Sequence, residues 1–222
     1  MERTIKVTGK GKISVTPDTI RMFITQTNVE QTYEGAIRES AKRKEELNEA
    51  LGTLGFKRED LKTLYFDIDT KYESYQTKNN NWKKRLVGYE YTHKIKIEFP
   101  KDNKMLGKVL GVISEIKGEP EFTIQYTISE PEKAKNELLA EAVIDSKEKA
   151  AVLAKAAGVN LGDIINIDYS WEEIDFYTRP IGNFMMRECP VEPDCENGSI
   201  DIDIEADDID VADTVTVVWT VS

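Results

Sequence analysis

The stretch VTGKGKISVTPDTI, residues 7–20, decides how the N-terminal part of the chain can fold. It places two glycines around Lys10, and then a Pro-Asp pair between two runs of alternating apolar residues. A glycine loop that binds phosphate must open a helix, whose first backbone N–H groups face the anion. Here more strand follows the glycines, so we interpret them as a β-bulge or a close backbone approach. We expect Pro17 and Asp18 to form the turn of a β-hairpin.

The middle of the chain alternates between helical and strand patterns of apolar residues. The predicted elements are a helix over 34–55, a long hairpin with apolar strand positions in 64–68 and 89–99, a helix over 102–116 and a strand over 122–128. Residues 19–128 therefore have the order strand-helix-strand-strand-helix-strand, which is the ferredoxin-like split arrangement.

The C-terminal part begins with a long alanine-rich helix. Ser129 and Glu132 have the spacing of a capping box, and the helix is predicted to end near Gly158. Strands are predicted over 164–171, 200–205 and 214–221, with the last two paired antiparallel. The pattern predicts an α+β fold, with antiparallel sheets, helices packed on one face, and strands from both termini added to the central ferredoxin-like βαββαβ portion.

A chain of 222 residues can bury a substantial core without disulfides or metals. We expect a single domain over residues 1–222, either undivided or with two lobes. In the second case residues 19–128 form the ferredoxin-like lobe, and residues 1–18 with 129–222 form the other.

The formal net charge of -11 disfavours attraction to nucleic acid or anionic lipid. No apolar run approaches the roughly 18 residues of a membrane-spanning helix, and the first residues lack the apolar core of a secretory signal. We therefore predict no nucleic-acid partner, no membrane span and a cytoplasmic location, or the cell envelope if an export signal has been removed.

Several blocks of the sequence resemble the SIMPL-domain family, also called YggE-like or outer-membrane-antigen-like proteins. They are VTGKGKISVTPDT, GFKREDLKT, VGYEYTHKIKI, ELLAEAVIDSKEKAAVLAKAAGVNLGDI and the closing DIDVADTVTVVWTVS. The blocks occur in the family's order and cover most of the chain. The resemblance implies an α+β fold, large homo-oligomers in some relatives, and no established catalytic residue or cofactor. Many relatives are exported bacterial proteins associated with the cell envelope or oxidative stress. His93 stands where relatives often carry asparagine.

The reactive side chains are sparse. His93 is the only histidine, and its position inside a strand favours a structural role over a catalytic triad or metal site. Cys189 and Cys195 lie in an acidic loop with neither zinc-ligand nor C-x-x-C spacing. We expect them to be reduced in a cytoplasm and bridged if the protein is exported, while a regulatory disulfide is the alternative. We predict no catalytic residue, no metal and no cofactor.

The acidic run DIDIEADDID, from Asp201, lacks the glycine and the final glutamate of a calcium loop, since Ala206 and Ala212 occupy those positions. Its alternation instead predicts a half-buried strand with Asp201 and Asp203 on the solvated side. We expect no tight calcium binding.

Two groups of apolar side chains are candidates for binding. Aromatic residues follow the long hairpin and could line a ligand groove or form an interface: Tyr72, Tyr75, Trp82, Tyr89 and Tyr91. The segment FYTRPIGNFMMR, residues 176–187, is broken by Pro180 and Gly182 and presents candidate self-association residues: Ile181, Phe184, Met185 and Met186. The alternative is that this segment folds back onto its own sheet.

Two functions remain from the sequence. The first is a non-enzymatic, self-associating scaffold or interaction module. The second is a protein that binds a small molecule or divalent cation, with or without hydrolysis, in a cleft on the aromatic hairpin.

Overall fold

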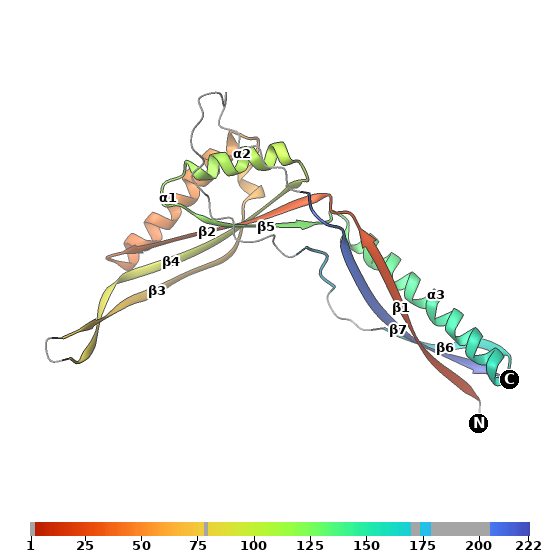
Figure 1. Ribbon diagram of the computed structural model, residues 1–222. Coiled ribbons are helices and arrows are strands. Elements are labelled where there is room, and N and C mark those ends of the chain that lie inside the picture. Colours follow the sequence, from red (N-terminus) through yellow and green to blue (C-terminus); the bar gives the residue numbers. More distant parts are fainter. Residues whose placement is uncertain (1–2, 78–79, 170–173, 179–204) are drawn as a thin grey trace. The chain divides into compact units, whose positions relative to one another are not determined.

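The structure is a computed structural model, and it describes residues 3–77, 80–169, 174–178 and 205–222 (Figure 1). These residues form two compact units. The central unit comprises the described residues 19–77, 80–126 and 205, and the terminal unit comprises residues 3–18, 127–169, 174–178 and 206–222.

The central unit is a four-stranded antiparallel sheet with two helices. Its elements in order are β2 (Thr19–Glu30), α1 (Tyr33–Gly52), the short 3-10 helix η1 (Arg58–Asp60), β3 (Lys62–Gln76), β4 (Trp82–Pro100), α2 (Asn103–Ser114) and β5 (Glu121–Thr127), whose last residue belongs to the terminal unit. The strand order is β3-β4-β2-β5, and Figure 1 shows α1 and α2 on one face of the sheet. The predicted α+β fold with antiparallel sheets is confirmed, as is the long hairpin formed by β3 and β4.

The core of the central unit lies between its sheet and its helices. Alternate residues of β2 and β4 point toward the helices because strand side chains alternate between faces. The fully buried side chains include Ile20, Met22, Ile24, Tyr91, Ile95 and Ile97 from the strands and Leu47, Leu51, Leu106 and Ile113 from the helices.

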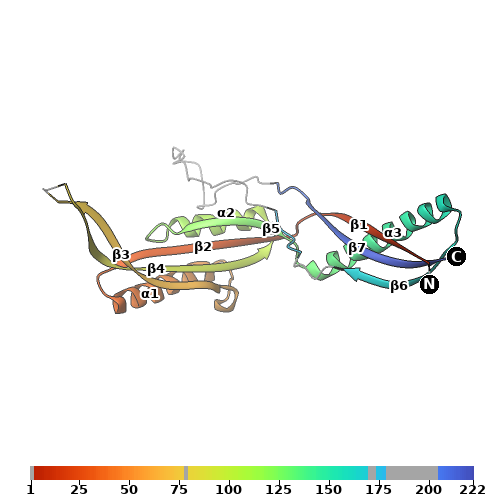
Figure 2. The ribbon, with the colours of Figure 1, turned by 90° about the horizontal axis from the view of Figure 1, so that it is seen from below.

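The terminal unit is a three-stranded antiparallel sheet packed against one long helix. Its elements are β1 (Thr4–Val15), α3 (Pro131–Ala157), β6 (Leu161–Tyr169) and β7 (Ile209–Val221), and the strand order is β1-β7-β6. The C-terminal strand β7 pairs with both other strands, so Val217 lies opposite both Val7 and Ile167. Figures 1 and 2 both show α3 running along β1 and β7.

Two glycines let α3 approach β1 closely. A Cβ atom on Gly9 would lie 2.0 Å from the carbonyl oxygen of Ala142, and one on Gly11 would lie 2.1 Å from the carbonyl oxygen of Leu138. Real Cβ atoms do not tolerate such distances, so the glycines are required by a close backbone approach. The structure thus decides between the two interpretations of the glycine pair.

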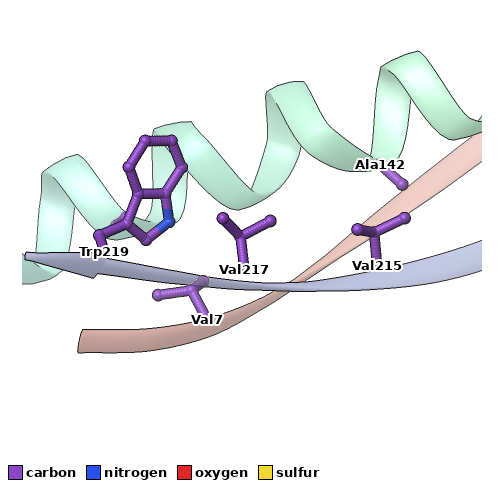
Figure 3. Close-up of a cluster of buried hydrophobic side chains, with 6 residues drawn as sticks. Val7, Ala142, Val215, Val217 and Trp219 are labelled. Carbon is purple, nitrogen blue, oxygen red and sulfur yellow. The ribbon is translucent and has the colours of Figure 1, made fainter. Parts of the chain in front are cut away.

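A small hydrophobic cluster fills the space that this approach leaves (Figure 3). Trp219, Val217 and Val215 of β7 and Val7 of β1 point toward α3, where Ala142 and Ala150 face them. Alanines suit this position because small side chains allow a helix to lie close to a sheet.

The prediction that Pro17 and Asp18 form a hairpin turn is wrong. Strands β1 and β2 flank this pair but belong to different sheets, since β1 pairs with β7 and β2 pairs with β4. Alternation on both sides of a turn signal identifies two strands, but it does not show that they pair with each other. The two residues therefore connect two sheets.

The prediction of a capping box at Ser129 and Glu132 is also wrong. The N-cap of α3 is Glu130, whose side chain makes no capping hydrogen bond, and Pro131 occupies the first turn. The carboxylate of Asp18 accepts hydrogen bonds from the backbone N–H of Ser129 at 2.7 Å and from its hydroxyl at 2.6 Å. A carboxylate is a stronger acceptor than a neutral group, so it holds the serine that the local pattern assigned to a cap. The helix ends as predicted at Gly158, which has a φ of 70°.

We predict that Gly9→Ala destabilises the protein by about 3 kcal/mol, the upper end of typical overpacking costs, because the new methyl group would overlap the α3 backbone. Urea unfolding at neutral pH measures the change. Gly52→Ala is the matched control: a Cβ atom there meets nothing within 4 Å, and this helical position should gain about 0.5 kcal/mol. Equal stabilities for the wild type and Gly9→Ala would contradict the close approach.

We predict that Asp18→Ala lowers the free energy of unfolding by about 1 kcal/mol, because two hydrogen bonds to Ser129 are lost. The change is read from the midpoint of chemical unfolding. Glu148→Ala, at an exposed acidic position of α3, should leave the midpoint unchanged. A loss of the same size in both variants would show that charge, and not the anchoring of Ser129, is responsible.

Candidate functional site

The aromatic residues predicted to form a groove are distributed between the core and the surface. Tyr91 is buried in the core of the central unit, and Tyr89 is half-buried, with its ring 6.0 Å from that of Tyr33 on α1 in an edge-to-face arrangement. Tyr72 and Trp82 are 56% and 70% exposed. Tyr91 thus contributes to the packing of the sheet against its helices.

The strand register places the exposed aromatic side chains on two different faces of the hairpin. Tyr72 pairs with Leu86, and Gln76 pairs with Trp82, so the side chains of Tyr72, Trp82 and Leu86 share one face of the hairpin. Tyr75 pairs with Lys83 and lies on the opposite face. We call Tyr72, Trp82 and Leu86 the hairpin patch, and it is an exposed apolar surface on one side of the β3–β4 hairpin.

A second apolar surface lies on strand β6. Ile164, Ile167 and Tyr169 pair with Trp219, Val217 and Val215, whose side chains face α3. The three β6 side chains therefore point to the same side of the sheet, yet they are 43%, 45% and 38% exposed. Helix α3 does not cover them, because it packs on β1 and β7 and hardly contacts β6. We call these three residues the β6 surface.

The two edges of this sheet differ in how they are protected. At the β1 edge, the backbone N–H of Lys10 donates to the carboxylate of Asp145 on α3 at 2.6 Å, and Lys6, Lys10 and Lys12 are exposed along the strand. Lysines and a covering helix both discourage pairing with another strand. The sequence of β6, LGDIINIDY, contains no lysine and no proline, and β6 is the last strand of its sheet in the described part of the chain. The β6 strand therefore lacks these two kinds of protection within the described residues.

The sequence predicted a strand over 164–171, which overlaps β6, but it did not predict that the apolar side chains of this strand are exposed. A run such as DIINIDY is compatible with a buried strand, and only the position of α3 shows that this helix does not cover it. The absence of lysine from its sequence was the available signal.

His93 occupies a closed polar site in the central unit. It is buried, its Nδ1 lies 3.3 Å from the Ser40 hydroxyl, and its Nε2 lies 2.9 Å from the Thr63 hydroxyl. The Phe66 ring packs against it edge to face, with ring centroids 5.2 Å apart. Burial, and to a lesser degree the charge of Lys44, lowers the pKa of His93. Both ring nitrogens are engaged by neutral hydroxyl groups, an arrangement that suits a neutral structural histidine.

The remaining candidates lie outside the described residues. They are Ile181, Phe184, Met185 and Met186 of the predicted self-association segment, Cys189 and Cys195, and the acidic positions Asp201 and Asp203 with most of the strand predicted over 200–205. Within the described ranges, histidine, cysteine and acidic side chains form no group of three or more that could hold a metal ion. Nor does any helix in these ranges have the length and apolar character needed to cross a membrane.

The fold and these surfaces define an α+β protein with two antiparallel sheets, each packed against helices, and with exposed apolar strands. The chain belongs to the SIMPL family, described as a protein of unknown function (DUF541), whose family model matches residues 5–219. The family assignment made from the sequence blocks is thereby confirmed.

Two curated relatives carry the name 26 kDa periplasmic immunogenic protein. The protein from Brucella abortus (strain S19) is 25% identical over 163 residues, and the one from Brucella melitensis biotype 1 is 24% identical over 163 residues. Each alignment covers 73% of this chain and 65% of the relative. The chain therefore matches just under two thirds of the length of these relatives.

We predict that the protein loses stability as the pH falls below the ordinary histidine pKa of about 6.5. The folded state holds the pKa of His93 below that of the unfolded chain, so the unfolded state binds more protons in this range. The stabilising contribution is complete above the unfolded pKa and is lost toward acid. Urea unfolding between pH 8 and about pH 5 measures the slope.

His93→Asn is the control for this titration. It removes the titrating group and should flatten the dependence on pH across this range, although acidic side chains still contribute below it. An equal slope for the wild type and the variant would contradict the assignment to His93.

Proposed function

We propose that this SIMPL-family protein is a non-enzymatic, self-associating scaffold or interaction module. The observation that carries the proposal is the β6 surface. It joins three partly exposed apolar side chains to a strand edge that has no strand partner among the described residues. Sheet edges of this kind bind a further strand, and exposed apolar patches commonly mark partner sites.

A second copy of the chain is the partner we propose for this surface. Two β6 strands related by a twofold axis would pair antiparallel and extend the three-stranded sheet, which satisfies the outward backbone groups of both. The pairing would also bring the two apolar β6 surfaces side by side. The net charge of -11 on each copy opposes this contact at low salt, and ions screen the repulsion.

The protein's place in the cell is a separate part of the proposal. The Brucella relatives are named as periplasmic, and on this basis we propose export of this chain in place of the cytoplasmic location expected from its N-terminal sequence. In an oxidising compartment we expect Cys189 and Cys195 to form a disulfide. The association with the cell envelope or oxidative stress rests on family resemblance.

The alternative, a ligand cleft on the aromatic hairpin, gains no support from the structure. Tyr72 and Trp82 share one face of the hairpin, whereas Tyr75 lies on the other and Tyr91 is buried. A single cleft cannot use all of these side chains.

We predict that Ile167→Lys converts the oligomer to a smaller species. A lysine at the centre of the β6 surface would place charges against each other across the contact, and it also protects a strand edge. Light scattering after size-exclusion chromatography at about 0.15 M salt measures the mass. The matched control is Val152→Lys on α3, an equally drastic change at a position that is 68% exposed, and it should leave the mass unchanged.

Two outcomes would contradict the proposal. A wild-type protein that stays monomeric at all concentrations would exclude self-association. An oligomer that survives Ile167→Lys but dissociates when Ile181, Phe184, Met185 and Met186 are replaced by serine would move the contact to that segment.

A further inference from the structure

The β3–β4 hairpin extends beyond its sheet as a two-stranded arm. Strand β4 pairs with β2 only as far as Tyr89, whereas its pairing with β3 continues to Trp82. We call residues 71–76 and 82–86 the hairpin arm, and every one of them is exposed. Figures 1 and 2 both show the arm projecting past the helices of the central unit. A two-stranded ribbon is only marginally stable by itself, so a partner that covers the hairpin patch would stabilise the arm.

The arm is basic in a chain that is acidic overall. It carries four basic residues and one acidic residue, while the whole chain has a net charge of -11. Lys71 and Arg85 form ion pairs with nearby glutamates, whereas Lys83 and Lys84 form none within the described ranges. Lys84 pairs with Ser74, so its side chain lies on the same face as the hairpin patch. This face of the arm is therefore both aromatic and cationic.

A groove in the central unit offers the complementary chemistry. It has a volume of about 510 Å³ and is lined by residues of α1, of α2 and of the turn after each helix. The lining combines half-buried apolar residues with three glutamates: Ala50, Val112, Ile116, Glu46, Glu49 and Glu115. Lys117 also belongs to the lining, and the groove still keeps an excess of negative charge. We call it the acidic groove.

The helix ends in the lining add to this negative charge. Thr53 and Glu115 are the C-caps of α1 and α2, and the carbonyl end of a helix carries a partial negative charge. Lys155 offsets such a charge in the last turn of α3, but neither α1 nor α2 has a basic residue in its last turn. In the described part of the chain, Glu49 and Glu115 form no ion pair, while Glu46 lies 3.8 Å from a lysine. The acidic groove therefore favours a cationic partner.

We propose that the hairpin arm of one copy docks into the acidic groove of a second copy. Trp82 occupies the apolar part of the groove, and Lys83 and Lys84 approach the carboxylates of Glu49 and Glu115. Aromatic side chains and complementary charges are typical of protein interfaces. A nucleic acid or an anionic bilayer would attract the arm, but the negative charge on the rest of the chain would repel it. The inference rests on the self-association proposed above and adds a contact that does not use β6.

The arm cannot reach the groove of its own copy. It leaves the central unit beside Tyr33, the first residue of α1, since the ring of this tyrosine contacts Tyr89. At about 3.3 Å per residue, Trp82 then lies roughly 20 Å further along β4. The acidic groove lies on the second half of α1, away from this end. The contact therefore joins the arm of one copy to the groove of another, which is a heterologous interface.

The test uses the full chain carrying Ile167→Lys, which removes the β6 contact. Light scattering after size-exclusion chromatography at about 0.15 M salt measures the mass over a range of concentrations. We expect an oligomer held by the arm, and adding Trp82→Ser should raise its dissociation constant about thirtyfold, as for loss of a central tryptophan in an interface. Val152→Ser, at a position of α3 that is 68% exposed, is the matched control and should leave the constant unchanged.

Charge reversal tests the paired residues. Lys83→Glu with Lys84→Glu makes the net charge more negative, whereas Glu49→Lys with Glu115→Lys makes it less negative. Each pair of substitutions should dissociate the oligomer, and all four in one chain should restore it, because opposite charges face each other again. Net charge alone would act in opposite directions in the two pairs. An unfolding midpoint close to that of the parent protein shows that each variant is folded.

The proposal is overturned if the Ile167→Lys protein is monomeric, a result that would leave the β6 contact standing. An oligomer that withstands Trp82→Ser, or that the four-residue exchange does not restore, overturns it as well. If Trp82→Ser lowers the mass of the wild type and Ile167→Lys does not, the arm contact stands and the β6 contact fails. A monomeric wild type that sediments with phosphatidylglycerol vesicles through Trp82 would assign the arm to a lipid surface and reject docking between copies.

Discussion

Helix α3 lies so close to strand β1 that only glycine fits at two positions of the strand. The backbone oxygens of Ala142 and Leu138 occupy the space where side chains of Gly9 and Gly11 would begin. This contact fixes α3 over β1 and its neighbour β7, and therefore joins the first strand of the chain to the last. It also determines what stays uncovered, because one helix placed over β1 and β7 cannot cover β6. The exposed β6 surface is thus a consequence of the glycine pair.

The sequence allowed much of this architecture to be predicted. Alternation of apolar residues located the strands, and apolar residues at helical spacing located α1 and α2, because each element buries one face. The order of elements in residues 19–128 was enough to infer the ferredoxin-like arrangement. The glycine pair was correctly assigned to a strand, since no helix follows it. These features are local, and their physical causes lie within a few residues of each pattern.

The errors concern contacts between residues far apart in the chain. Pro17 and Asp18 have the composition of a hairpin turn, but β1 pairs with β7, at the other end of the chain, and β2 pairs with β4. Ser129 has the spacing of a helix cap, but a carboxylate 111 residues away binds both of its donors. The exposure of Ile164, Ile167 and Tyr169 depends on the placement of α3. No pattern along the chain reports such relationships.

The acidic character of the protein has a structural explanation at two positions. Asp18 binds the backbone and side chain of Ser129, and Asp145 binds the backbone N–H of Lys10 at the edge of β1. The hydrogen bond from Lys149, together with that from Lys10, lowers the pKa of Asp145, so this carboxylate stays charged over the physiological range. Both aspartates thus accept backbone N–H groups that would otherwise need another partner. At Asp145 this occupies one outward backbone N–H of the β1 edge. The two edges of the sheet thus differ, because only the β1 edge has both lysines and a hydrogen bond to the covering helix in the described part of the chain.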